Sequence, residues 1–322
     1  MPKTVSGWWG QWLRVDPSQW PLRRLFWSGE EPALTGHDDL PRVQAIVATI
    51  LQEGTPADWE AIRWSAVLPL LPTLPVADPV RAFWEEFWKE AQAMEDRRAQ
   101  VLDTEQRHIL RVAAAVLPAE GFELAGGTAL AAGYLGHRLS DDLDFFTDRP
   151  AITAGLRALQ AAWTDAGIPW RVETAQTTFA RLWVGTRPVK VELAQDSAFH
   201  LEPTRRSLEG MPIRSLADLA ADKCLALFGR AATRDFVDVY YLLQTTYDLS
   251  QLMTLARQKD PGFDRDWFIK ALLQVDRVHP AQVRMLAPID WDDVRRVFRH
   301  AAIRLERQRM AEEAESEEDE RP

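Results

Sequence analysis

Two aspartates one residue apart, preceded by a glycine pair, have the types and spacing that could perform chemistry. The stretch 126–146 reads GGTALAAGYLGHRLSDDLDFF. In an extended strand, Asp142 and Asp144 point to the same side, about 7 Å apart along the backbone. Two carboxylates on one face repel each other, and such oxygen ligands favour Mg²⁺ or Mn²⁺. A solvated strand face without a cation is the alternative.

The glycine pair comes directly after a predicted strand and directly before a predicted helix. Backbone amides at a helix N-terminus bind anions, and glycine lets a ligand approach closely. Thr128 adds a hydroxyl to Gly126 and Gly127. The pattern predicts a phosphate site, although it matches neither the Rossmann fingerprint nor the P-loop. A purely structural turn is the alternative.

A third acid fits the same logic. The segment PVKVELA alternates apolar residues with Lys190 and Glu192, which therefore share one strand face. A neighbouring strand could place Glu192 beside the two aspartates. Three carboxylates can hold two metal ions about 4 Å apart, which clamps the attacking and leaving oxygens of phosphoryl transfer. Otherwise Glu192 is a solvated edge residue.

The elements that must position these residues follow from hydrophobic periodicity. A helix capped by Thr104 is predicted first, and then a strand, a helix, a strand, a helix and a meander of three strands. Their segments are EQRHILRVAAAVL, GFELAGG, TALAAGYLG, DLDFF, AGLRALQAAWTDAG, WRVETAQ, FARLWVGT and PVKVELA. From Ser215, the expected N-cap of the next helix, the chain is predicted to be helical. We therefore expect a small mixed α/β domain followed by a helical domain.

The first third of the chain differs from the rest. Nine of the fourteen tryptophans lie between Trp8 and Trp88, and prolines at every third position from 69 to 75 indicate an extended, polyproline-like connector. A recognition motif is the alternative for the prolines. The predicted domains are a Trp-rich, mainly helical extension, a core, a helical domain and an acidic disordered tail, over residues 1–103, 104–214, 215–310 and 311–322.

Charge and cysteine content narrow the classes of protein. The net charge of −10 includes seven acids and one arginine in the last eleven residues, so the remainder carries only −4 and a basic groove for nucleic acid is not excluded. The single cysteine, Cys224, permits no intramolecular disulfide and is expected as a buried thiol in a reduced compartment. No signal peptide or membrane helix is apparent, so a cytoplasmic protein without membrane contact is expected. HExxH, GxSxG and paired-cysteine designs are absent.

The glycine turn, the DxD pair and a later acid together resemble the nucleotidyltransferase superfamily of DNA polymerase β. Within it, LAGGTALAAGYLGHRLSDDLDFF and SLADLAADKCLALFGRAATRDFVDVYYLL resemble the AbiEii/AbiGii toxin family, over about residues 104–245. Members of that family are nucleotidyltransferase toxins of toxin–antitoxin and phage-defence systems. The resemblance implies an α+β fold: a polymerase β-like core with a mixed sheet, a C-terminal helical domain after it and the Trp-rich extension before it.

The resemblance also implies roles for individual residues. Asp142, Asp144 and Glu192 would be catalytic and hold the metal, and Lys223 would join them in catalysis. The nucleotide-binding candidates include residues of the family motifs and two further cations, Arg138 and Lys190, taken from the same stretches. They are Gly126, Gly127, Thr128, Arg138, Lys190, Lys223, Arg234, Asp235 and Asp238.

Structural alternatives stay open for several of these side chains. Lys223 could be an exposed helix residue. Asp235 and Asp238, one turn apart, could cap their helix, pair with a nearby arginine (Arg230 or Arg234) or reach the active site. Arg138 could contact phosphate or pair with Asp141 or Asp142.

The expected activity is Mg²⁺- or Mn²⁺-dependent transfer of a nucleoside monophosphate from a nucleoside triphosphate to an acceptor hydroxyl. The acceptor would be an RNA 3′ end, tRNA included, or a protein, and an antitoxin protein would be a further partner. The alternative is a module of the same fold that binds nucleotide or a partner without turnover. Residues 1–103 match nothing in the family, and could bind substrate, contact a partner or brace the fold.

Overall fold

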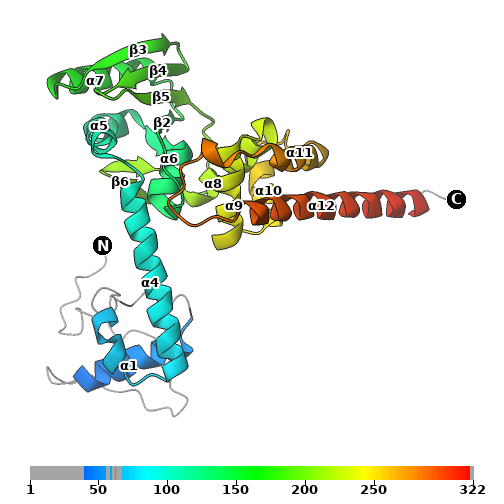
Figure 1. Cartoon of the computed structure of the whole chain (residues 1–322). Helices are drawn as coiled ribbons and strands as arrows, with labels where there is room; N and C mark the ends of the chain where they lie inside the picture. The colour runs from blue at the N-terminus through cyan, green and yellow to red at the C-terminus, as the bar shows by residue number, and fades with distance from the viewer. Residues whose placement is uncertain (1–39, 56–58, 60–61, 63–66, 320–322) are drawn as a thin grey trace. The chain divides into compact units, whose positions relative to one another are not determined.

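A computed structural model describes residues 40–55, 59, 62 and 67–319, and divides the chain into two compact units, Met1–Ala93 and Met94–Pro322 (Figure 1). Most of the tryptophans of the predicted extension lie outside the described residues. None of the helices within the described ranges is both long enough and apolar enough to cross a membrane.

The first unit has its own small core. Helix α1 (Leu40–Glu53), the 3-10 helix η4 (Leu68–Thr73) and the first part of α4 (Asp78–Gln100) surround Trp84. The indole N–H of Trp84 donates to the carbonyl of Leu51 at 2.9 Å. The proline-rich segment within η4 is a tight helical turn, so the prediction of a polyproline-like connector is wrong there. The guanidinium of Arg81 donates to the carbonyls of Leu74 and Val76, which satisfies groups at the end of that turn.

The second unit combines one sheet with a set of helices, as predicted. Its sheet has the strand order β3-β4-β5-β2-β1-β7-β6, with β5 parallel to β2 and β7 parallel to β1. The first elements are α5 (Thr104–Ala114), η5 (Leu117–Glu120), β1 (Glu123–Ala125), α6 (Gly126–Leu130), the π-helix η6 (Ala131–Leu135), β2 (Asp142–Thr147), α7 (Ile152–Asp165), β3 (Trp170–Ala175), β4 (Phe179–Val184), β5 (Val189–Gln195), β6 (Arg206–Leu208) and β7 (Met211–Ile213).

The helical part follows β7. It consists of α8 (Leu216–Arg230), α9 (Thr233–Thr245), α10 (Leu249–Lys259), α11 (Arg265–Leu272), the 3-10 helices η7 (Leu273–Arg277) and η8 (Pro280–Gln282), and α12 (Trp291–Asp319). Helix α12 continues through residues 311–319, where the sequence pattern predicts a disordered tail. Ser215 caps α8 as predicted, since its hydroxyl accepts the N–H of Asp218. The cap of α5 is Asp103 rather than Thr104, because Asp103 forms a capping box with Gln106.

The two faces of the sheet differ in burial and in the side chains that they carry. Along β2 the residues alternate, with Leu143 and Phe145 fully buried and the aspartates partly exposed. Ala180, Leu182 and Val184 of β4 and the apolar residues of β5 share the buried face, where α7 packs against these strands and α5 packs against β7. Trp163 of α7 is completely buried in this core. The period of two along the strands thus leaves the acids on the opposite, more open face.

The turn between β1 and α6 has room for glycine alone. Gly126 has a φ of +67°, a conformation in which other residues are strained. A Cβ on Gly126 would lie 2.1 Å from Oδ2 of Asp144, and a Cβ on Gly127 would lie 2.5 Å from Nη2 of Arg138. The glycine pair therefore leaves space for two side chains of the candidate site.

We predict that Gly126→Ala lowers the free energy of unfolding by about 2 kcal/mol or more, because it adds both backbone strain and a clash with Asp144. Chemical denaturation measures the loss. Gly229→Ala is the control: no atom lies within 4 Å of the added Cβ, so this helical change should be neutral or stabilising by up to about 1 kcal/mol.

A double-mutant cycle isolates the contact. In an Asp144→Ala background the clashing oxygen is absent, so Gly126→Ala should cost about 1 kcal/mol less than in the wild type. Equal losses in both backgrounds would contradict a contact between the turn and Asp144.

Candidate active site

The predicted carboxylates meet where β2 and β5 pair in parallel. The register sets Asp142 opposite Lys190 and Asp144 opposite Glu192. Strand β1 completes the arrangement, since Ala125 lies opposite Asp144 and leads into the glycine turn. Three strands thus bring the three acids and the turn to one place on the open face of the sheet.

Cationic side chains hold these carboxylates. The ammonium of Lys190 lies 2.9 Å from Oδ2 of Asp142 and 3.5 Å from Oε1 of Glu192. Nε of Arg181, on β4, donates to Oε1 of Glu192 at 2.6 Å. Arg234, about half exposed on α9, has Nη1 3.9 Å from Oδ2 of Asp142. The cluster therefore combines three acids with three cations.

The surroundings of Asp144 disfavour its ionised form. Burial, followed by the negative charges of Glu192 and Asp142, raises the pKa of Asp144 to about 6, against the opposing effect of Lys190 and Lys223. The hydrogen bond with Asp142 raises the pKa of Lys190, although partial burial opposes the change. The surroundings of Asp144 thus favour a bound positive charge, which is a frequent property of functional sites.

A second cluster of charged side chains surrounds the fully buried Asp238, close to the carboxylate cluster. Its carboxylate accepts Nε and Nη2 of Arg138 at 2.6 and 2.9 Å, and Nζ of Lys223 lies 2.8 Å away. Nε2 of the buried His137 lies 2.7 Å from Oδ1. Burial opposes ionisation of Asp238, but Arg138 and Lys223 outweigh it and hold its pKa well below the usual range.

The histidine of this cluster is neutral. Burial lowers the pKa of His137, against the pull of Asp238. The ring then donates from Nε2 to Asp238, and Nδ1 carries a lone pair rather than a proton. Nδ1 is buried without a hydrogen-bond partner among the described residues. An unpaired acceptor is less costly than an unpaired donor would be at this depth.

The structure places two predicted nucleotide-binding cations inside this cluster. Lys223 is 5% exposed and Arg138 is also 5% exposed, so neither is a surface residue. Arg138 pairs with Asp238 instead of Asp141 or Asp142. Lys223 still lies close enough to lower the pKa of Asp144, so it supports the carboxylate cluster electrostatically from below.

Other predicted residues have structural partners. The hydroxyl of the buried Thr128 donates to the backbone carbonyl of Asp142, which fixes the turn to the start of β2. Asp235 is fully buried and accepts Nε and Nη2 of Arg230, each at 2.7 Å. Among Arg234, Asp235 and Asp238, Arg234 alone places a partly exposed cation near the acids.

Sequence reasoning missed Arg181 and the role of His137. Arg181 lies opposite Glu192 in the antiparallel pairing of β4 and β5. The alternation in FARLWV places it on the same strand face as Phe179 and Trp183, so the strand period was the available signal. His137 gave no comparable signal, because its partner lies 101 residues away.

We predict a pH-dependent effect of Asp144→Asn on the metal-free protein. The folded pKa of Asp144, about 6, exceeds the unfolded value. Stability therefore falls as the pH rises between about 4 and about 6, because the unfolded state ionises first. The variant should be more stable than the wild type by about 1 kcal/mol at neutral pH, a figure reduced for solvent screening. The difference should vanish near pH 4.

Melting curves in EDTA at both pH values test this effect. Asp165→Asn, at an exposed acid on α7, should change little at either pH. An Asp144→Asn variant that is less stable than the wild type at neutral pH would contradict the electrostatic interpretation.

We predict that Asp238→Asn lowers the free energy of unfolding by about 3–5 kcal/mol, because it leaves two buried cations without their counter-charge. Lys223→Met should cost less, since Asp238 keeps Arg138 and His137. Urea denaturation measures both, with Lys270→Met, at an exposed lysine of α11, as the control that changes stability by under about 0.5 kcal/mol. A negligible loss in Lys223→Met would contradict a stabilising role for the ion pair between Lys223 and Asp238.

This chain is similar to several known proteins. A protein of Aquifex aeolicus, the uncharacterized aq_aa25, is 28% identical over 206 residues, which cover 62% of this chain and 94% of that protein. JHP933 from Helicobacter pylori is 19% identical, with a TM-score of 0.41, over 65% of this chain and 95% of that one. The nucleotidyltransferase toxin MenT4 from Mycobacterium tuberculosis is 16% identical, with a TM-score of 0.37, over 60% and 80%.

The family comparison covers most of the chain. The model of the nucleotidyl transferase AbiEii toxin family, described as a type IV toxin–antitoxin system, matches residues 108–321. The matched range contains the glycine turn, the carboxylate cluster and the cluster around Asp238, whose geometry is described above. This chain therefore belongs to the AbiEii family of nucleotidyltransferases.

Proposed function

We propose that this chain transfers a nucleoside monophosphate from a nucleoside triphosphate to an acceptor hydroxyl, and acts as the toxin of a toxin–antitoxin pair. The main support is the register of β2 and β5, which sets Glu192 opposite Asp144 beside the glycine turn. Family membership supports the reaction class. The acceptor would be an RNA 3′ end or a protein, and the second partner an antitoxin protein.

The carboxylate cluster suits a divalent cation by its chemistry. In the described part of the chain, no group of three His, Cys, Asp or Glu side chains is arranged closely enough to hold a metal ion. The ammonium of Lys190 instead lies between Asp142 and Glu192, so a cation already occupies this position. Carboxylate oxygens are the ligands that Mg²⁺ and Mn²⁺ prefer. Asp142, Asp144 and Glu192 would hold the metal once these ion pairs exchange.

Individual residues of the chain would have separate roles in the reaction. A bound metal ion would neutralise charge on the triphosphate. Lys190, released from the carboxylates, and Arg234 would bind phosphate oxygens, because both are cations at the open face. The acceptor hydroxyl would give its proton to the Glu192 carboxylate while its oxygen attacks the α-phosphorus. The bond from that phosphorus to the bridging oxygen would break in line, and pyrophosphate would leave.

Positioning depends on the surrounding pairs. Arg181 fixes Oε1 of Glu192, and the glycine turn leaves space for the carboxylate of Asp144. Lys223 and Asp238 hold α8 and α9 against the segment before β2. Since phosphoryl transfer relies mainly on positioning and charge neutralisation, these contacts matter as much as the acids.

One observation favours a second candidate, a nucleotide-binding module without turnover. Lys190 and Arg181 already neutralise two of the three acids. A protein that only senses nucleotide could keep these pairs and bind phosphate through exposed cations. The two candidates differ in whether label is transferred.

We predict that the wild type, incubated with each labelled nucleoside triphosphate, Mg²⁺, total RNA and cell protein, transfers label to one fraction. Asp142→Asn and Glu192→Gln should reduce the transfer by about 10²-fold or more, because charge stabilisation at the reacting phosphate is lost. Asp165→Asn is the matched control and should retain full transfer.

A thermal-shift experiment separates the two candidates. Mg²⁺ with nucleotide should stabilise the wild type and fail to stabilise Asp144→Asn, since a ligand stabilises only the state that binds it. A shift without label transfer to any fraction would favour the module without turnover. Absence of both would refute the proposed function.

A further inference from the structure

We infer that a groove along α12 binds the phosphodiester backbone of an RNA. The first observation is a difference among the arginines of α12. Six arginines lie between positions 295 and 309. Four of them pair with carboxylates, namely Arg295, Arg296, Arg299 and Arg309. Arg304 and Arg307 pair with no carboxylate in the part of the chain that the structure describes.

The two free arginines share one face of the helix. His300, Arg304 and Arg307 are spaced by four and three residues, so they form a stripe along α12. All three line a groove of about 1010 Å³ that also includes Leu249 and Val297. A polar stripe beside an apolar floor is therefore open to a ligand.

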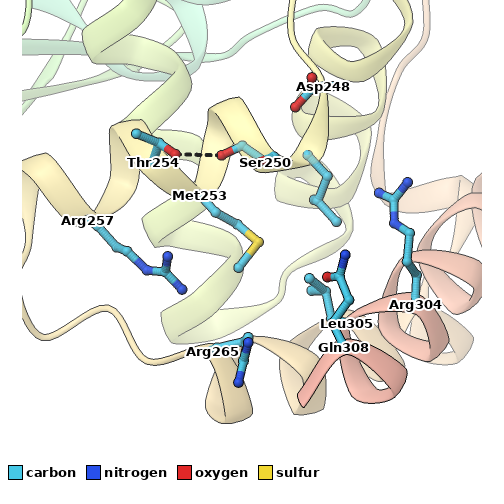
Figure 2. Close-up of a pocket in the computed structure, with 10 residues that line it drawn as sticks. Asp248, Ser250, Met253, Thr254, Arg257, Arg265, Arg304, Leu305 and Gln308 are labelled. Atoms are coloured by element: carbon cyan, nitrogen blue, oxygen red, sulfur yellow. Dashed lines mark hydrogen bonds between the residues drawn. The ribbon is translucent and has the colours of Figure 1, made fainter. Parts of the chain in front are cut away.

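A second pocket continues the groove past Arg304. It has a volume of about 370 Å³ and shares Arg304 and Gln308 with the larger groove. Figure 2 shows that Arg257 comes from α10, Arg265 from the start of α11 and Arg304 from α12. Three separate helices thus contribute guanidinium groups to one pocket.

The balance of charge in these pockets is strongly positive. Asp248 is the only acid among the residues that line them in the described structure, and its carboxylate caps α10 by accepting the N–H of Gln251 at 2.8 Å. Arg265 pairs with Glu312 at 2.7 Å. Arg257 lies over the ring of Phe263 and has no ion pair among the described residues. Arg257, Arg304 and Arg307 therefore remain available to an anion.

The chemistry of the lining favours a backbone with several phosphates. A guanidinium fork binds phosphate oxygens in pairs, and a chain of phosphates can use arginines on successive helices. Two connected pockets exceed what one phosphate would fill. No residue of the carboxylate cluster lines either pocket, so the groove is a separate binding surface from the candidate active site.

The choice of RNA as the ligand rests on the proposed function. The RNA-binding experiment can nevertheless fail or succeed independently of nucleotide transfer. Fluorescence anisotropy of a labelled single-stranded RNA is measured with full-length wild type and with Arg257→Gln/Arg304→Gln/Arg307→Gln. We expect the triple variant to bind at least about 10-fold more weakly, and the slope of log affinity against log salt to fall by about 2, or about 0.7 for each lost phosphate contact. The matched control, Arg295→Gln/Arg296→Gln/Arg299→Gln, removes the same charge from arginines that already have partners and should retain the affinity.

Three further measurements decide the interpretation. The Arg257→Gln/Arg304→Gln/Arg307→Gln variant should melt like the wild type, since these arginines lie at the surface, and both triple variants should keep the thermal shift with Mg²⁺ and nucleotide. Equal RNA binding by the two triple variants would overturn the inference, as would tighter binding of DNA of the same sequence. Loss of binding to an acidic peptide with unchanged RNA affinity would assign the groove to a protein partner instead. RNA binding that needs Arg304 and Arg307, in a protein without a nucleotide shift, would refute the proposed function and leave the groove assigned.

Discussion

The ion cluster around Asp238 is the interaction on which the rest of the site depends. A carboxylate with no exposed surface is tolerated because Arg138, Lys223 and His137 surround it. Arg138 in turn occupies the space beside Gly127 that a side chain at that position would fill. A continuous set of contacts therefore leads from α9 through Arg138 to the glycine turn, and from the turn to Asp144. The helical part of the chain therefore helps to position the acids of the sheet.

The carboxylate cluster of Asp142, Asp144 and Glu192 differs from the Asp238 cluster in burial. There the acids are partly exposed and close together, and the cations that pair with them directly are partly exposed as well. Lys190 and Arg181 lie at the surface of the sheet, whereas Arg138 and Lys223 are enclosed. The two clusters therefore differ in how far their cations are withdrawn from solvent.

Local patterns in the sequence predicted five of the seven strands and the face that carries the acids, but not the short strands β6 and β7. The alternation in DLDFF and PVKVELA predicted β2 and β5, and the family motifs pointed to the glycine turn. Three features differ from the prediction, and only the last depends on a contact between distant parts of the sequence. Asp103 rather than Thr104 is the cap because Gln106 completes a capping box, and the proline-rich segment forms η4, with Arg81 donating to the carbonyl of Leu74 directly after it. The partner of Arg138 was mistaken because Asp238 lies far away in the sequence.

The distance along the chain between the members of the Asp238 cluster has a consequence for synthesis. Arg138 and Asp238 are 100 positions apart, and a ribosome adds about 5–20 residues per second. The acids of β2 therefore leave the ribosome several seconds before the carboxylate that positions their turn. A nascent chain that stops before α9 carries every acid of the carboxylate cluster. It lacks Asp238, the buried anion that holds Arg138 and Lys223. Such a fragment would therefore lack the packing that holds Arg138 beside the glycine turn.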